Sequence, residues 1–270
     1  MGTSASLPAA KSGVRVGSQT NAWPVDPKNF ESLMAVLATI KELGFDGFET
    51  GFLNLRGQFE SPDATFDRLR KTGLRFFGIH VFLTRYDPQT AIGSAGLLEQ
   101  VADGGKALGA ERLVVSGAPT VHPLALKAKA DALNRIGKYC RNIGMGCAYH
   151  NHGAEFEDGG AQMNGLLSQT DATVHFVLDA GHAMEAGANV AGFFARNWKR
   201  IDGIHLRDAK AGQEVPLGEG DYDFAPLAKE IQASAWRGWL VTEEERLNGE
   251  KPGEAAVRPA RAAIRKVFGV

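Results

Sequence analysis

Short apolar segments recur along this chain at regular intervals and constrain its fold more than any other feature. Eight of them start 27 to 38 residues apart: Val14–Ser18, Phe45–Glu49, Leu74–Val81, Ala110–Ser116, Met145–Asn151, Val174–Asp179, Ile201–His205 and Trp239–Glu243. That spacing is too long for β-hairpins and suits strands joined by crossover helices. Most of the segments are continuous apolar runs, which is typical of strands buried on both faces of a parallel sheet.

The segments between these strands have the apolar spacing of helices and are followed by glycine. Helices are predicted over Pro27–Leu43, Pro62–Lys71, Leu97–Leu108 and Pro123–Ile143, with Asp26 as the N-cap of the first. We therefore predict one α/β domain over residues 14–270, a (β/α)8 TIM barrel. An open doubly wound sheet is the alternative, but no G-x-G-x-x-G motif follows the first strand.

Composition argues against several classes of function. The chain has 30 Lys and Arg against 31 Asp and Glu, a formal net charge of −1, so we expect no nucleic-acid partner. No apolar run reaches the roughly 18 residues of a membrane-spanning helix, so we expect no membrane partner. Cys140 and Cys147 are the only cysteines. They do not make a disulfide framework, and we interpret them as a buried reduced pair.

The first 13 residues are small and polar, and we interpret them as a disordered leader. They have neither the charged nor the apolar region of a signal peptide, so we predict a cytoplasmic protein, with export after removal of a signal peptide as the alternative. The sequence leaves the oligomeric state open, although the outer helices of barrels commonly pair into homo-oligomers.

Ionisable and hydrogen-bonding residues stand at the C-terminal ends of the predicted strands, which is where TIM-barrel active sites lie. Five of the seven histidines are among them, in the set Gln19, Asn21, Glu49, His80, Ser116, His150, Asn151, His152, Asp179, His182, His205, Arg207, Asp208 and Glu243. Taken singly, each also fits a structural role: Asp179 as the cap of the next helix, for example, or Glu49 as the partner of an arginine. Carboxylates that converge without a cation repel one another, so the whole set points to a bound metal.

Four of these residues form the predicted metal site: His150, Asp179, His205 and Glu243, one from each of the fifth to eighth strands. Mixed nitrogen and oxygen ligands favour one divalent ion of Mn, Zn, Co or Fe over Ca, with Mg less favoured beside two imidazoles. His152 lies on the same face of its strand as His150, so it could replace His150 as a ligand or carry protons.

Four runs in the second half of the chain resemble the xylose isomerase-like TIM barrel superfamily. They are YHNHGAEFE (149–157), LDAGHAMEAG (178–187), IHLRD (204–208) and LGEGDYDF (217–224). The group comprises sugar (phosphate) isomerases and epimerases, inosose and dehydroshikimate dehydratases, and repair enzymes of the endonuclease IV type. The resemblance implies a divalent metal held by Glu, Asp, His and Glu on strands five to eight. Asp179, His205 and Glu243 match these ligands.

The first ligand departs from the family pattern. Where many epimerases have a glutamate on the fifth strand, this chain has His150, as in the YHNH variant of the family. Since those epimerases use the two glutamates as their two proton-transfer bases, the departure weakens a symmetrical two-base epimerisation. Glu155 or Glu157, in the loop beyond the strand, are alternative ligands.

The expected chemistry is enolisation of a small carbohydrate or polyol, with a metal-stabilised enediolate. An isomerase or epimerase is the first prediction, and a dehydratase (lyase) acting on a keto-sugar or keto-cyclitol is the second. A nuclease of the endonuclease IV type and a non-enzymatic sugar-binding barrel are the remaining alternatives. The predicted roles are ligand and base for Glu243, general acid or base for His152, and substrate contacts for Glu49, His80, His182 and Arg207. Phe52, Phe82 and Trp23 are candidates for an apolar wall.

Overall fold

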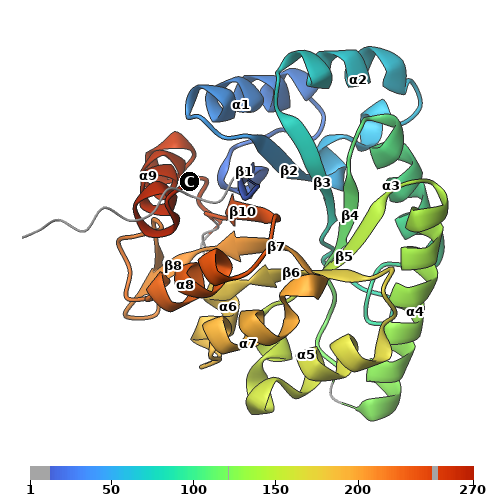
Figure 1. Cartoon of the computed structure of the whole chain (residues 1–270). Helices are drawn as coiled ribbons and strands as arrows, with labels where there is room; N and C mark the ends of the chain where they lie inside the picture. The colour runs from blue at the N-terminus through green and yellow to red at the C-terminus, as the bar shows by residue number, and fades with distance from the viewer. Residues whose placement is uncertain (1–12, 121, 245–248) are drawn as a thin grey trace, which may run out of the picture.

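A computed structural model describes residues 13–120, 122–244 and 249–270. Nearly all of the predicted leader lies outside these ranges. The described chain forms a closed barrel of eight parallel strands (Figure 1), which confirms the predicted fold class. In their order around the barrel, the strands are β1 (Arg15–Gln19), β2 (Gly47–Gly51), β3 (Arg75–Val81), β4 (Arg112–Val115), β5 (Gly146–His150), β6 (His175–Asp179), β7 (Ile201–Leu206) and β10 (Trp239–Thr242). Pairing of β10 with β1 closes the ring.

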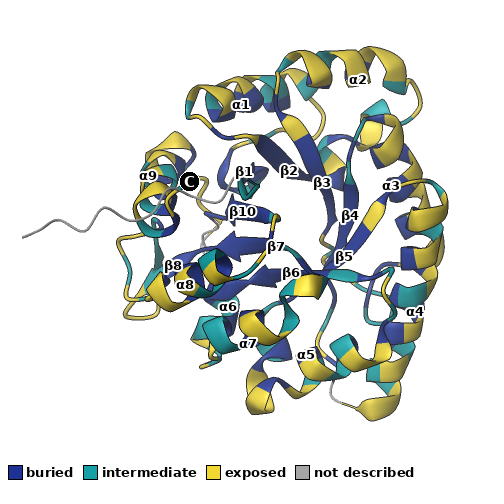
Figure 2. Cartoon of the chain, viewed as in Figure 1, coloured by how far each residue is buried: buried dark blue, intermediate teal, exposed yellow. Residues whose placement is uncertain are grey.

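Helices surround the barrel and expose their outer faces to solvent (Figure 2). They are α1 (Phe30–Glu42), α2 (Pro62–Lys71), α3 (Ala95–Ala107), α4 (Pro123–Asn142), α5 (Glu157–Gln169), α6 (Ala180–Glu185), α7 (Val190–Asn197), α8 (Ala225–Ala233) and α9 (Glu254–Phe268). A small antiparallel pair, β8 (Asp208–Lys210) and β9 (Gln213–Val215), follows β7 and was not predicted. None of the described helices is long and apolar enough to span a membrane.

The predicted N-cap of the first helix is wrong. Asn29 caps α1, and its side chain accepts a hydrogen bond from the Glu31 amide at 3.1 Å. The Asp26 side chain instead accepts from the Lys28 amide at 2.9 Å, so the Asp26 carboxylate stabilises a turn before the helix. Two Asx residues three positions apart offer the same local signal, and only the path of the chain selects between them.

The glycines at the ends of four helices have the backbone conformation that the sequence predicts. Gly44, Gly73, Gly109 and Gly144 have φ angles of 78°, 68°, 90° and 71°. A side chain is strained in this left-handed region, so glycine allows the chain to turn from each helix directly into the next strand.

Large side chains fill the barrel interior below the C-terminal face. Phe77 stacks on Trp239 with ring centroids 4.1 Å apart, and Val241 packs with both. Gly17 makes room for this layer, because a Cβ at position 17 would lie 2.3 Å from Phe77 Cε1. The interior is thus a packed core, and the chemically capable side chains collect above it at the strand ends. As predicted, Cys140 and Cys147 are both buried free thiols that form no disulfide.

Candidate metal centre

The four residues predicted as metal ligands meet at the C-terminal face of the barrel. His150 and Asp179 end β5 and β6, His205 lies near the end of β7, and Glu243 directly follows β10. All four are buried, and each offers a nitrogen or oxygen atom within 4.8 Å of those of the others. Parallel pairing sets this convergence, because the register places Asp179 beside His205.

Contacts within the group are short. His205 Nδ1 lies 2.5 Å from Glu243 Oε2 and 3.1 Å from His150 Nε2. His150 Nε2 lies 3.4 Å from Glu243 Oε2 and 3.6 Å from Asp179 Oδ2. Among the described residues, no donor makes a hydrogen bond of good geometry to the buried Asp179 Oδ2, although Arg207 Nε lies 3.0 Å from it as an ion-pair partner. A buried carboxylate oxygen of this kind, facing two imidazole nitrogens and a second carboxylate, fits a divalent transition metal.

The electrostatics of the group also favour a cation. Burial lowers the pKa of His205, but the carboxylates of Glu243 and Glu49 outweigh burial and raise that pKa to about 10. Burial raises the pKa of Glu243, yet the positive charges of His205 and Arg207 lower it well below its usual value. His150 differs, since burial lowers its pKa to about 3. The carboxylates of Glu243 and Glu49 therefore stabilise a positive charge at His205. A metal ion would compete with the proton for the His205 nitrogen.

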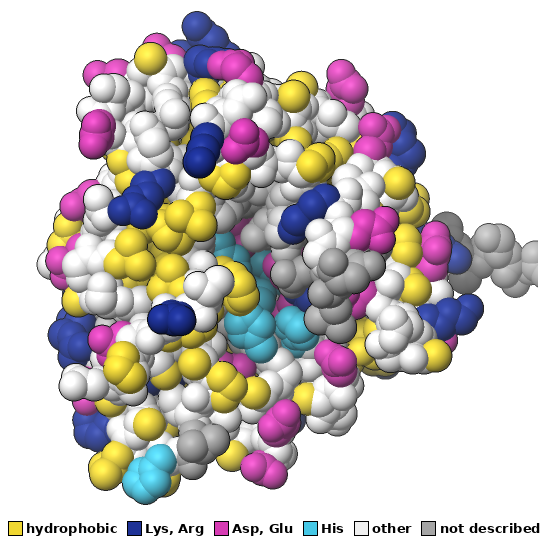
Figure 3. Space-filling view, turned by 180° about the vertical axis from the view of Figure 1, so that it is seen from behind, with side chains coloured by type: hydrophobic (Ala, Val, Ile, Leu, Met, Phe, Trp, Pro, Cys, Tyr) yellow, Lys and Arg dark blue, Asp and Glu magenta, His cyan; other side chains and the backbone are white. Residues whose placement is uncertain are grey.

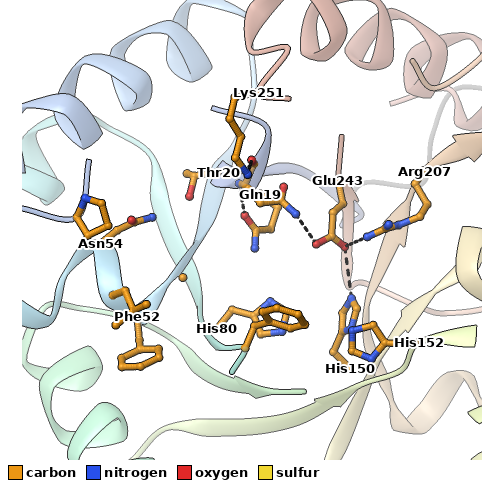
Figure 4. Close-up of a pocket in the computed structure, with 15 residues that line it drawn as sticks. Gln19, Thr20, Phe52, Asn54, His80, His150, His152, Arg207, Glu243 and Lys251 are labelled. Carbon is orange, nitrogen blue, oxygen red and sulfur yellow. Dashed lines mark hydrogen bonds and ion pairs between the residues drawn. The ribbon is translucent and has the colours of Figure 1, made fainter. Parts of the chain in front are cut away.

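Arg207 lies between the two carboxylates of the group. Its Nε is 3.0 Å from Asp179 Oδ2 and its Nη2 is 3.2 Å from Glu243 Oε2. The predicted role of Arg207 is a substrate contact. The residue does line the pocket beside the group, but its guanidinium faces protein carboxylates. Figure 4 shows Arg207 and His150 both directed at Glu243.

Glu49 supports His205 from the side opposite the group. Glu49 Oε1 lies 3.4 Å from His205 Nε2 and 3.1 Å from His80 Nδ1. His80 Nε2 lies 2.8 Å from Ser116 Oγ. Histidine ligands typically donate their second ring N–H to a carboxylate, which fixes the ring orientation. Glu49 and His80 are both predicted to contact the substrate. His80 lines the pocket, although both of its ring nitrogens have protein partners. Glu49 is not among the described residues that line the pocket.

Two asparagines for which the sequence predicts no role contact the two carboxylate residues of the group. Asn21 Nδ2 donates to Glu243 Oε1 at 2.8 Å. Asn151 Oδ1 accepts from the Asp179 amide at 2.9 Å, and its Nδ2 donates to the Asp179 carbonyl oxygen at 3.2 Å. Their positions at strand ends were visible in the sequence, but their partners were not. Asp179 also caps α6, because its Oδ1 accepts from the His182 amide at 2.8 Å. The cap uses Oδ1 and leaves Oδ2 facing the group.

A pocket of about 330 Å³ opens beside the group. Figure 3 shows this hollow with histidines inside it and hydrophobic side chains gathered along one side. Phe52, Leu53 and Phe82 form an apolar wall, with Leu53 and Phe82 half exposed. Polar lining comes from Gln19, Asn21, Asn54 and Lys251. Of the predicted aromatics, Trp23 is buried in the core instead. No sequence pattern pointed to Asn54 or Lys251.

His152 faces the pocket without joining the group. Its ring centroid lies 5.3 Å from that of His150, 5.4 Å from that of His182 and 5.9 Å from that of Phe82. Burial lowers its pKa below the usual value. His182 is not among the described residues that line the pocket, and its Nδ1 lies 3.6 Å from Glu185 Oε2.

The loop glutamates, Glu155 and Glu157, lie outside the group of four residues. Glu155 is buried and has its own partners, Lys129, Tyr149 and the His152 amide. Glu157 is exposed at the start of α5. His150 is therefore the residue that this structure places at the fifth-strand position of the group.

Comparisons with known proteins agree with this architecture. The model of the xylose isomerase-like TIM barrel family matches residues 37–267. An inosose dehydratase of Lacticaseibacillus casei is 30% identical over 136 residues, which are 43% of this chain and 46% of that protein. An inosose dehydratase of Clostridium beijerinckii is 28% identical over 142 residues, 44% of this chain and 47% of that protein. The chain thus spans about half the length of these curated relatives. A third inosose dehydratase, from Erwinia tasmaniensis, is 24% identical over 88% of this chain and 91% of its own.

Solved structures share the fold at low sequence identity. An L-ribulose 3-epimerase superposes with a TM-score of 0.78 at 19% identity, covering 95% of both chains. The IolI protein, whose crystal structure binds a zinc atom, superposes with a TM-score of 0.76 at 16% identity, covering 94% of this chain and 98% of its own. With the matched family model extending over most of its length, this chain belongs to the xylose isomerase-like TIM barrel family.

Proposed function

We propose that this protein is a metal-dependent enzyme that removes a proton beside the carbonyl of a keto-cyclitol or keto-sugar and expels a neighbouring hydroxyl as water. The observation that carries the proposal is the convergence of His150, Asp179, His205 and Glu243 beside the pocket. Two imidazoles and two carboxylates suit Zn, Mn, Co or Fe better than Mg or Ca. When bound, such an ion supplies Lewis acidity that polarises a substrate carbonyl.

His152 is the proton carrier in this proposal. It lines the pocket outside the group of ligands, so its ring is available to a substrate. Because burial lowers its pKa, the imidazole is neutral at neutral pH and can accept a proton from the carbon next to the carbonyl. The imidazolium then returns that proton to the hydroxyl that leaves from the adjacent carbon. The C–H and C–O bonds break, a C=C bond forms, and the products are an enone and water.

Glu243 acts as a ligand rather than as the main base. Its two oxygens already face Asn21, His205 and Arg207. These donors lower its pKa and reduce its affinity for a proton. Since β5 also ends in His150 instead of a glutamate, the pair of bases that a symmetrical epimerisation needs is incomplete.

We therefore rank elimination above isomerisation as the proposed reaction, whereas the sequence alone favoured isomerisation. The curated relatives that are inosose dehydratases support this order. Isomerisation is the second candidate, because a single base such as His152 can also move a proton between neighbouring carbons on one face of a sugar.

The pocket wall suits a ring with one apolar face. Phe52, Leu53 and Phe82 offer carbon surface, whereas Gln19 and Asn54 offer hydrogen bonds. Cyclitols and cyclic sugars have this division between C–H faces and hydroxyl edges. We propose a small keto-polyol as the substrate class.

Turnover by metal-loaded protein tests the proposal. The protein is loaded in turn with Zn²⁺, Mn²⁺, Co²⁺ and Fe²⁺, then incubated with an inosose and with a panel of keto-sugars in deuterated water. Ultraviolet absorbance of an enone supports elimination, and deuterium in a rearranged sugar supports isomerisation instead. Asp179→Ala and His205→Ala should abolish both metal binding and turnover. A protein that binds none of the four metals would overturn the proposal.

A further inference from the structure

Lys129 on α4 is completely buried. Lys129 Nζ donates to the Ala118 carbonyl oxygen at 3.0 Å and to the Tyr149 hydroxyl at 2.5 Å, and it lies 3.4 Å from Glu155 Oε1. The Tyr149 hydroxyl donates to the same Glu155 oxygen. Apolar residues of similar size are often as stabilising as a buried ion pair, so global stability alone does not explain this arrangement.

The other oxygen of Glu155 leads to the pocket. Glu155 Oε2 accepts a hydrogen bond from the backbone N–H of His152 at 3.0 Å. Glu155 ends the short 3-10 turn Gly153–Glu155 that directly follows His152, and its side chain folds back onto the start of that turn. One buried carboxylate therefore connects Lys129, on an outer helix, to the backbone of the histidine that faces the substrate.

The His152 ring is linked to the same turn, because the His152 and Glu155 side chains form a capping box, each accepting from the other residue's backbone N–H. It sits among the rings of His150, His182 and Phe82, with centroids 5.3 to 5.9 Å away. Phe82 itself is half exposed at the pocket mouth. The direction of the ring thus depends on the backbone to which it is attached, and that backbone is held through Glu155.

We propose that Lys129 and Glu155 form a positioning pair that fixes the backbone of His152 and so aims its imidazole into the pocket. The inference rests on the proposed function, in which His152 carries the proton. Lys129 offsets the charge of the buried Glu155 carboxylate and holds one of its oxygens, which leaves the second oxygen for the His152 amide. A neutral acceptor at position 155 should therefore not need the lysine. A displacement of about 1 Å in a proton-transfer group lowers turnover by roughly 100-fold, so a small loss of alignment is measurable.

Two double variants separate the positioning role from the ion pair itself. Both replace Lys129 with Met, which fills the space without charge. In Lys129→Met/Glu155→Gln, the Gln carbonyl oxygen can still accept from the His152 amide, and its amide group can donate to the Tyr149 oxygen. In Lys129→Met/Glu155→Leu, both charged side chains become apolar, so the His152 amide loses its acceptor and the Tyr149 hydroxyl loses its two charged partners. Neither variant leaves an unpaired buried charge.

Two readouts follow for each variant. The first is hydrogen–deuterium exchange of the segment 150–156, which is independent of turnover. We expect exchange in the Leu variant to be at least tenfold faster in this segment than in the wild type, with the rest of the barrel unchanged, and exchange in the Gln variant to match the wild type. The second is turnover of whichever probe substrate the wild type accepts. We expect kcat to fall about 10- to 100-fold in the Leu variant and to recover to within about threefold in the Gln variant, with KM and metal stoichiometry steady.

The outcomes that overturn the inference are distinct from those that overturn the proposed function. Wild-type exchange and kcat in the Leu variant would show that the pair positions nothing. Loss of metal together with kcat in both variants would assign the pair a merely structural role. If the Leu variant does not fold, Lys129→Met alone replaces it, and wild-type behaviour of that variant sinks the proposal. A wild type that turns over no probe contradicts the proposed function only, since the exchange experiment still tests the pair.

Discussion

The Asn21 side-chain amide donates a 2.8 Å hydrogen bond to Glu243 Oε1, although 222 positions separate the two residues in the sequence. The bond joins the loop after β1 to the end of β10, the two strands that close the barrel. The same contact orients a carboxylate of the proposed metal site, so closure of the barrel and formation of the site are linked.

Loss of this hydrogen bond should weaken metal binding. We expect Asn21→Ala to lower the affinity for Zn²⁺ about tenfold, because groups that orient a metal ligand typically contribute 10- to 100-fold to affinity. Isothermal titration calorimetry measures the effect. Asn54→Ala is the matched control, since Asn54 also lines the pocket but donates to Thr50 Oγ1 at 3.0 Å. Equal loss of affinity in both variants would contradict the assignment.

Glu49 should raise the metal affinity through its contact with His205, without binding the metal itself. Glu49→Gln retains the size of the side chain but removes the charge 3.4 Å from His205 Nε2, so we expect zinc affinity to fall about tenfold. Glu111→Gln, which alters the partly exposed ion pair with Arg75, should leave the affinity unchanged. Direct titration of both variants with zinc decides the question, and an unaffected Glu49→Gln protein would disprove the support role.

Metal binding should release a proton and weaken as the pH falls. A metal displaces the proton from His205, whose pKa is raised to about 10 by Glu243 and Glu49 against the effect of burial. Below pH 10, each unit of decrease in pH should therefore lower the apparent affinity about tenfold. Calorimetry in buffers of different ionisation enthalpy should detect about one proton released per metal at pH 7. If no proton is released on metal binding, His205 does not bind the metal through Nδ1, the nitrogen that faces Glu243.

The barrel interior should not tolerate an added methyl group at Gly17. A Cβ there would lie 2.3 Å from Phe77 Cε1, inside the layer that Phe77 forms with Trp239. We expect Gly17→Ala to lower the free energy of unfolding by about 1–3 kcal/mol, as overpacking does. Urea denaturation measures this change. Gly96→Ala is the control, because α3 has open space at that position and alanine is a better helix former than glycine. If Gly17→Ala has the same free energy of unfolding as the wild type, the Phe77 ring can shift to accommodate the methyl group, which would contradict a tightly packed layer.

The repeating strands and the residues that end them were predictable from the sequence alone. Each of the eight predicted strands overlaps an observed one, and the four proposed ligands meet as expected. Both results have the same cause. Parallel strands in a barrel bring their C-terminal ends to one face, so residues that end successive strands in the sequence lie together on that face.

Partnership between side chains was decided only by the tertiary structure. Arg207 lies between Asp179 and Glu243, and Lys129 reaches Glu155 from another helix. No sequence spacing relates such residues, because a long charged side chain can reach several neighbours. The packing of the barrel determines which opposite charge lies within reach. Pairing with that charge offsets the cost of removing the charged group from water.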